Sequence, residues 1–105
     1  MRPLIRFTYL SFELNALLDE GKFLEITEVQ DSIENESIFD FLKEKFVGKI
    51  DLSLYREEDK KELMDFFKGL SNVVDARRKF GVEKNGISLL LAYCIEGIQQ
   101  LKRLK

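Results

Sequence analysis

The hydrophobic pattern of the first half of the chain predicts a mixture of helix and strand. A helix is expected between Ser11 and Gly21, because leucines recur there at helical spacing and glycine suits the left-handed residue that ends a helix. Apolar and polar residues alternate, as in half-buried strands, in three segments: 5–9, 23–29 and 50–54. Residues 1–54 are therefore expected to form a mixed half with a two- or three-stranded sheet.

A second helix is expected over residues 37–48. Ser37 and Asp40 have the spacing of a capping box, in which the serine oxygen accepts a hydrogen bond from an N–H of the first turn. Gly48 stands where a helix ends. The stripe expected to be buried comprises Ile38, Phe41, Leu42 and Phe46.

The second half, residues 55–105, is expected to be helical. Apolar residues keep a helical stripe from residue 57 to residue 79, and Asn85 is a natural N-cap for a last helix that runs to about Leu104. We expect these two helices to pack antiparallel across the turn between them. No linker, repeat or low-complexity stretch divides the chain, so the expected architecture is one mainly helical domain spanning residues 1–105.

The apolar face of the last helix is wider than one helix contact requires. Apolar residues recur at 4-3-4-3 spacing from Ile87 to Leu101, and Leu90 and Leu104 broaden this seam. The helix is either the centre of the core or also the interface of a homodimer or of a partner complex. In the second case, the residues expected at the interface are Leu90, Leu91, Cys94, Ile98, Leu101 and Leu104.

The composition argues against several functional classes. The chain has 105 residues, 45% of them hydrophobic, and a net charge of −2, which argues against a uniformly basic nucleic-acid binder. It has no His, the commonest general acid or base, and its one cysteine, Cys94, lies in an apolar stretch typical of a buried thiol. No phosphate-binding loop, nucleophile elbow or calcium-loop spacing occurs. We therefore expect no enzyme activity, no cofactor and no metal.

Basic residues cluster at Arg77, Arg78 and Lys79. They fall near the end of an expected helix, where positive charge favourably opposes the helix dipole. The alternative is contact with phosphate groups or with an acidic partner. A cytoplasmic location without a membrane partner is expected, because no apolar run approaches the roughly 18 residues of a spanning helix.

Residues 77–87, Arg-Arg-Lys-Phe-Gly-Val-Glu-Lys-Asn-Gly-Ile, resemble the junction before the last helix in MerR-type regulators of the heat-shock-repressor and chaperone-modulator branch. In those families a basic helix ends in a Leu-Gly-Val-like turn, and a Gly-Ile pair opens an apolar helix. Residues 55–59 resemble the Tyr-x-x-x-Asp start of the preceding helix. The resemblance covers the C-terminal half only, and no helix-turn-helix for reading DNA is visible. It therefore points to the chaperone modulators, which bind the J-domain of a co-chaperone.

The leading hypothesis is a non-catalytic, regulatory protein-binding module that acts by occluding a partner, with a J-domain protein as the partner that the resemblance implies. The chain is expected to form a homodimer. One alternative is a dimeric transcriptional regulator that contacts DNA through Arg77, Arg78 and Lys79. Another is an immunity or antitoxin protein that neutralises a basic target with an acidic surface.

Overall fold

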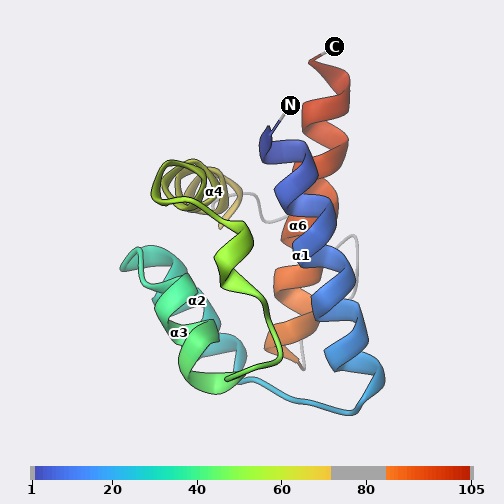
Figure 1. The fold of residues 1–105 in the computed structure, drawn as a ribbon, viewed down its shortest axis with the longest axis vertical. Helices are drawn as coiled ribbons and strands as arrows, with labels where there is room; N and C mark the ends of the chain where they lie inside the picture. The colour runs from blue at the N-terminus through green and yellow to red at the C-terminus, as the bar shows by residue number, and fades with distance from the viewer. Residues whose placement is uncertain (1, 72–84, 105) are drawn as a thin grey trace.

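The computed structural model describes residues 2–71 and 85–104, and this part of the chain is all-helical (Figure 1). Its elements are α1 (Arg2–Asp19), α2 (Ile26–Glu34), α3 (Ile38–Lys45), the 3₁₀ turn η1 (Leu52–Leu54), α4 (Glu57–Ser71) and α6 (Gly86–Arg103). None of the helices in these two ranges is both long and apolar enough to cross a membrane.

The helices form two groups (Figure 1). α1 and α6 run antiparallel, side by side, so that both ends of the chain lie at the same end of the molecule. The short helices α2 and α3 pack together beside this pair, and α4 runs across it, seen end-on in Figure 1. η1 lies between α3 and α1 and carries the chain up to the start of α4.

The contact between α1 and α6 depends on an aromatic ring packed against a glycine. A Cβ atom added to Gly97 of α6 would lie 3.1–3.2 Å from three atoms of the Phe7 ring, so glycine lets the two helices approach closely here. The same ring meets Phe66 and Phe67 of α4 edge-on, with centroid distances of 5.1 and 5.5 Å. Phe7 thus joins the three longest helices in one core.

The predicted sheet is wrong, because all three segments proposed as strands are helical or irregular in the structure. Residues 5–9 lie inside α1, and their alternation arises because Phe7 belongs to the buried face while Ile5 and Tyr9 lie on the opposite, exposed face. In residues 23–29, α2 begins at Ile26, and Val29 is buried at its helical position. Residues 50–54 contain η1, whose turn is closed by the Asp51 side chain accepting from the Ser53 N–H.

We expected the last helix to pack antiparallel against the helix before it in the sequence, and this prediction is also wrong. The antiparallel neighbour of α6 is α1, at the other end of the sequence, whereas α4 crosses the pair (Figure 1). Periodicity places an apolar face on a helix but does not say which other helix covers it. Residues 72–79 of the expected helix lie outside the described residues.

The helix ends were predicted with mixed success. Gly21 and Gly48 follow the first and third helices with φ of +79° and +74°, as expected of left-handed C-terminal residues. Asn85 caps α6 as expected, its side chain accepting from the Ile87 N–H at 2.9 Å. The capping box at Ser37 does not form. The Ser37 hydroxyl instead donates to the Ser32 carbonyl oxygen at 3.4 Å.

Glycine is required at Gly86, the first residue of α6, because Leu24 and Val29 pack closely against it. Its N–H donates to the Leu24 carbonyl at 2.7 Å. A Cβ atom there would lie 2.6 Å from Cγ2 of Val29 and 3.0 Å from Cβ of Leu24, closer than van der Waals contact allows. The start of α6 is therefore held directly against the loop between α1 and α2.

We expect Gly86→Ala to lower the free energy of unfolding by about 1–3 kcal/mol, because the added methyl group overlaps Val29. Gly69→Ala is the matched control: it lies inside α4 with open space around its Cα, so alanine should stabilise by about 0.5–1 kcal/mol. Urea unfolding midpoints measure both effects. Similar shifts for the two variants would contradict the close approach at Gly86.

Candidate functional site

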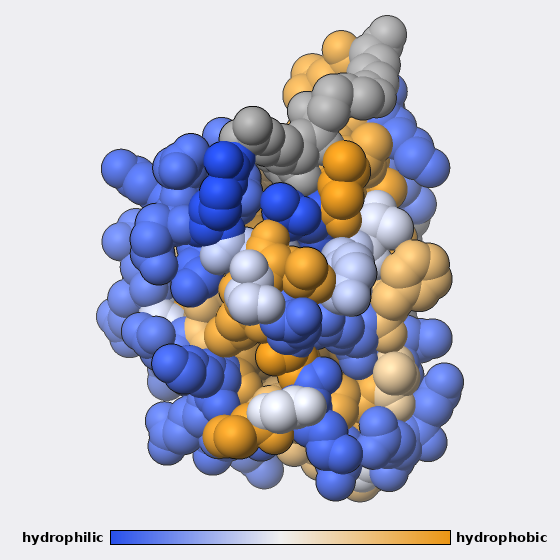
Figure 2. All heavy atoms as spheres, viewed as in Figure 1, coloured by the Kyte–Doolittle hydropathy of each residue, from blue (hydrophilic) through white to orange (hydrophobic). Residues whose placement is uncertain are grey.

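The charges of the chain are unevenly distributed, although they nearly cancel. Residues 25–65 contain thirteen acidic and six basic residues, whereas the rest of the sequence contains six acidic and eleven basic ones. Twelve of the thirteen acids are exposed, and hydrophilic side chains gather over α3 and α4 in Figure 2. We call residues 25–65, which carry α2, α3, η1 and the first half of α4, the acidic lobe.

A groove runs between α3 and α4 on this lobe, with a volume of about 320 Å³. Its floor is apolar: Phe39 and Met64 line it and are each 6% exposed. Its rim is mostly acidic and carries Glu36, Asp40, Glu57 and Asp65 alongside Lys60 and Lys61. We call this the α3–α4 groove.

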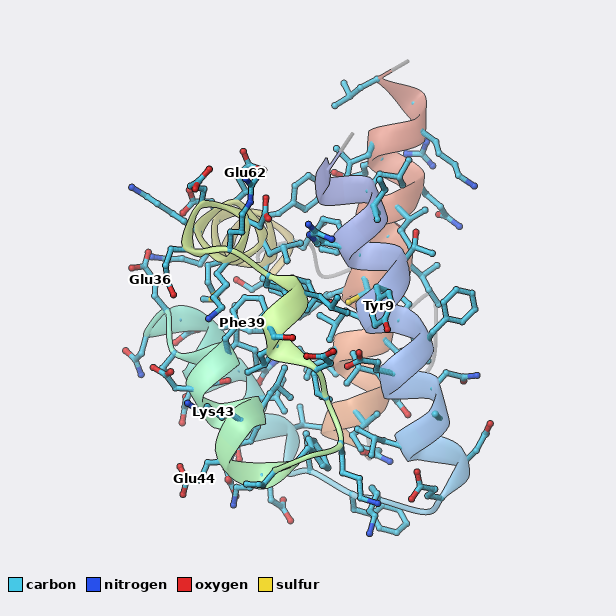
Figure 3. All side chains as sticks on the ribbon, in the orientation of Figure 1. Tyr9, Glu36, Phe39, Lys43, Glu44 and Glu62 are labelled. Atoms are coloured by element: carbon cyan, nitrogen blue, oxygen red, sulfur yellow. The ribbon has the colours of Figure 1, made fainter. Side chains whose placement is uncertain are left out.

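The groove continues along α3. A second hollow of about 440 Å³ shares Phe39, Asp40 and Lys60 with the first and extends to the loop after α3, where Val47 is 79% exposed. Figure 3 shows Glu36, Phe39, Lys43 and Glu44 along this side of the molecule, whereas Glu62 of α4 does not line either hollow. The two hollows together form one elongated surface that could receive an extended or helical segment of another chain.

Glu36, at the rim, has a backbone conformation that glycine would adopt more easily. Its φ is +56°, and it occupies the left-handed position that ends α2. Two hydrogen bonds close this end: the Glu36 N–H donates to Ile33 at 3.2 Å and the Ser37 N–H donates to Ser32 at 2.7 Å. The Glu36 carboxylate is 3.2 Å from Nζ of Lys68 on α4, so the strained residue connects the two walls of the groove.

The start of α4 is fixed by a buried carboxylate, Asp59, which is 3% exposed. Its Oδ2 atom lies 3.5 Å from Nε of both Arg6 and Arg56, and it accepts from the Arg56 backbone N–H at 3.4 Å. Arg6 also lies 5.9 Å from the centre of the Tyr55 ring, whose hydroxyl donates to the Arg6 carbonyl at 3.2 Å. This cluster ties α4, and hence one wall of the groove, to α1.

The surroundings of Asp59 favour its ionised form. Burial on its own would raise the pKa, but the hydrogen bonds from Arg56 and the positive charges of Arg56 and Arg6 outweigh it and hold the pKa below its ordinary value of 3.8. Asp59 therefore contributes stability that is fully present above pH 3.8 and is lost as the pH falls toward the lower folded pKa.

The six residues expected at an interface on the last helix do not form one exposed surface. Leu90 and Cys94 are fully buried in the chain's own core, and burial raises the pKa of the Cys94 thiol to about 12. Leu91, Ile98 and Leu101 are partly buried against that core, and Leu104 is 81% exposed. Through most of its length α6 is a central core helix. Arg77, Arg78 and Lys79 lie outside the described residues.

An exposed apolar face that the sequence analysis missed lies on α1. Ile5, Tyr9 and Phe12 are 57%, 44% and 71% exposed, and apolar atoms come to the surface over α1 in Figure 2. Their i, i+4, i+7 spacing is a helical signal in the sequence. It was hidden because residues 5–9 also alternate like a strand.

Comparison with known proteins does not assign the chain to a family. No family model, no curated protein and no solved structure matches it. Within residues 2–71 and 85–104, no three acidic or cysteine side chains converge to hold a metal ion. The candidate site is therefore defined by its own geometry, an acidic groove with an apolar floor.

We expect Asp59→Asn to lower the urea unfolding midpoint at pH 7, because it removes the ionised partner of Arg6 and Arg56. The difference in unfolding midpoint between Asp59→Asn and the unsubstituted chain should become smaller below pH 3.8, because protonation of Asp59 removes the same charge. Glu62→Gln, an exposed change on the same helix, should stay within about 0.5 kcal/mol at both pH values. A gap of constant size would show that the charge of Asp59 is not what stabilises the start of α4.

We expect Glu36→Gly to be about 1 kcal/mol more stable than Glu36→Gln. Both substitutions remove the ion pair with Lys68, but only glycine relieves the left-handed backbone. Chemical unfolding of the two variants in the same buffer gives the difference directly. Equal stabilities would mean that the backbone at Glu36 is not strained.

Proposed function

We propose that this chain is a non-catalytic protein-binding module that occludes a basic, amphipathic segment of a partner in the α3–α4 groove. The observation that carries the proposal is the combination of an apolar floor with a mostly acidic rim. An apolar side chain of the partner would cover Phe39 and Met64, while its lysine or arginine side chains would meet the carboxylates above.

The charge of the acidic lobe favours this class of partner beyond the groove itself. Its excess of exposed carboxylates attracts a basic surface and repels an acidic one, which raises the association rate and excludes most wrong partners. The same surface is unfavourable for DNA or RNA, whose phosphates would approach like charges.

The conformation of Glu36 supports a binding role for the rim. A chain selected only for stability would gain from glycine at this left-handed position, yet it carries a glutamate whose carboxylate stands at the groove. Local strain that persists beside a concave surface is typical of binding sites.

The resemblance of residues 77–87 to the chaperone modulators suggests what the partner is. A J-domain presents a basic helix, whose charge is complementary to that of an acidic groove. An immunity-type inhibitor of a basic target would use the same surface in the same way, so the chemistry of recognition is common to both.

A capture experiment with paired charge variants tests the proposal. Tagged chains, unsubstituted or carrying Asp65→Lys or Glu62→Lys, are used as baits in lysate of the source organism, with and without nuclease treatment, and the affinity for each captured protein is then measured. Both substitutions change the net charge by +2 in the middle of α4, but only Asp65 lines the groove. Asp65→Lys should weaken binding of the true partner about 10-fold or more, while Glu62→Lys should have a much smaller effect.

Two results would reject the proposal. If both variants weaken capture equally, the overall charge and not the groove attracts the partner. If capture requires intact nucleic acid, the DNA-binding regulator becomes the better explanation. A captured protein with a basic helix that is lost only with Asp65→Lys supports the groove, and a J-domain protein would support the resemblance.

A further inference from the structure

Glu13 of α1 holds the loop of residues 46–56, which contains η1 and joins α3 to α4 (Figure 1). We call this loop the η1 loop. The two carboxylate oxygens of Glu13 lie 3.2 and 3.4 Å from the backbone nitrogen of Asp51, whose N–H donates to them. The two residues are 38 positions apart in the sequence, so the contact attaches the η1 loop to a distant helix.

This attachment brings two carboxylates close together. The Asp51 side chain accepts hydrogen bonds from the Ser53 N–H at 3.1 Å and from the Ser53 hydroxyl, which closes η1. Partial burial raises the pKa of Glu13 most, the hydrogen bond from the Asp51 N–H lowers it, and the negative charge of Asp51 raises it again. The pKa of Glu13 therefore lies above its ordinary value of 4.5.

No basic side chain compensates these two charges. On residues 2–71 and 85–104, neither Glu13 nor Asp51 forms an ion pair, and Arg6, about two turns before Glu13 on α1, is bound to Asp59. The other titratable groups around the contact are two phenols and a thiol, types that are uncharged in mild acid: Tyr9, Tyr55 and Cys94. A proton taken up here in mild acid therefore goes to a carboxylate.

We propose that the Glu13–Asp51 contact is a pH-sensitive attachment, in which a proton on Glu13 holds the η1 loop against α1 and loss of that proton loosens it. A protonated Glu13 can donate to the Asp51 carboxylate, while its second oxygen still accepts from the Asp51 N–H. An ionised Glu13 is instead stabilised when the loop opens, because opening returns it to water and separates it from the charge of Asp51.

The attachment has the opposite pH dependence to the Asp59 cluster. Because the pKa of Glu13 is raised in the folded chain, the stability that Glu13 contributes is fully present below pH 4.5 and is lost as the pH rises through the folded pKa. Each pH unit by which the pKa of Glu13 exceeds 4.5 makes the attachment about tenfold weaker at neutral pH. Asp59 acts in a different window, below pH 3.8.

The η1 loop is a wall of the second hollow of the α3–α4 groove, which Ile50, Leu52 and Ser53 line. This hollow is therefore held in the observed shape more firmly in mild acid than at neutral pH. The effect on a bound partner rests on the proposed function. The attachment itself does not, and its test uses the free chain, so that the two can fail separately.

NMR titration of the Glu13 carboxyl carbon tests the coupling. The midpoint should lie above pH 4.5, and Asp51→Asn should lower it, because asparagine removes the charge but keeps an oxygen for the Ser53 N–H. Asp40→Asn, the same substitution at an exposed residue of α3, should leave the midpoint unchanged. A midpoint at or below pH 4.5, or equal shifts in the two variants, would overturn the inference.

Hydrogen exchange tests the attachment of the loop. After correction for the intrinsic pH dependence of exchange, protection of the Asp51 and Ser53 amides should fall between about pH 4.5 and about pH 7 in the unsubstituted chain. Glu13→Gln, which is neutral and keeps the acceptor oxygen, should retain high protection at both pH values. Glu62→Gln, an exposed change on α4, should behave like the unsubstituted chain. Protection that does not change with pH, or the same fall in Glu13→Gln, would reject the attachment.

Discussion

Phe7 packs against Gly97, and the close packing of α1, α4 and α6 depends on this contact. Because glycine has no Cβ, α1 and α6 approach closely and enclose the phenylalanine ring, whose edges are then met by Phe66 and Phe67 of α4. With α1 along one side, α2 and α4 also pack on α6, and α6 becomes the centre of the core. The surface available to a partner must therefore come from the other helices.

On residues 2–71 and 85–104, two such surfaces stand out, and they differ in physical character. The acidic lobe offers a charged groove with an apolar floor, suited to a basic amphipathic segment. The outer face of α1 instead exposes the apolar side chains of Ile5, Tyr9 and Phe12. The net charge of −2 conceals this difference, because the acidic lobe and the remainder of the chain nearly cancel. The function proposed for the acidic lobe requires no catalytic chemistry.

Sequence reasoning predicted some helix ends from local chemistry, but not the start of α1, which begins at Arg2 and not at Ser11, nor the cap at Ser37. Asn85, Gly21 and Gly48 mark ends that were predicted, and each has its expected conformation. The prediction failed where the same hydrophobic pattern is compatible with both a strand and a helix. The alternation of residues 5–9 is also produced by a helix that is apolar on two faces, and the groove could not be foreseen, because Phe39 and Met64 are 25 residues apart and meet only through the packing of α3 near α4.

The sequence by itself determined that α4 and α6 are helical, that Cys94 is buried, and that Asn85 caps α6, because each depends on neighbouring residues or on local hydrophobicity. Only the tertiary structure decided which helix covers α6, that Leu90 and Cys94 face the core instead of a partner, and that Ile5, Tyr9 and Phe12 remain exposed. The reason is that a hydrophobic face requires burial but does not specify its partner. That choice is made by shape, and here it depends on the absence of a side chain at Gly97.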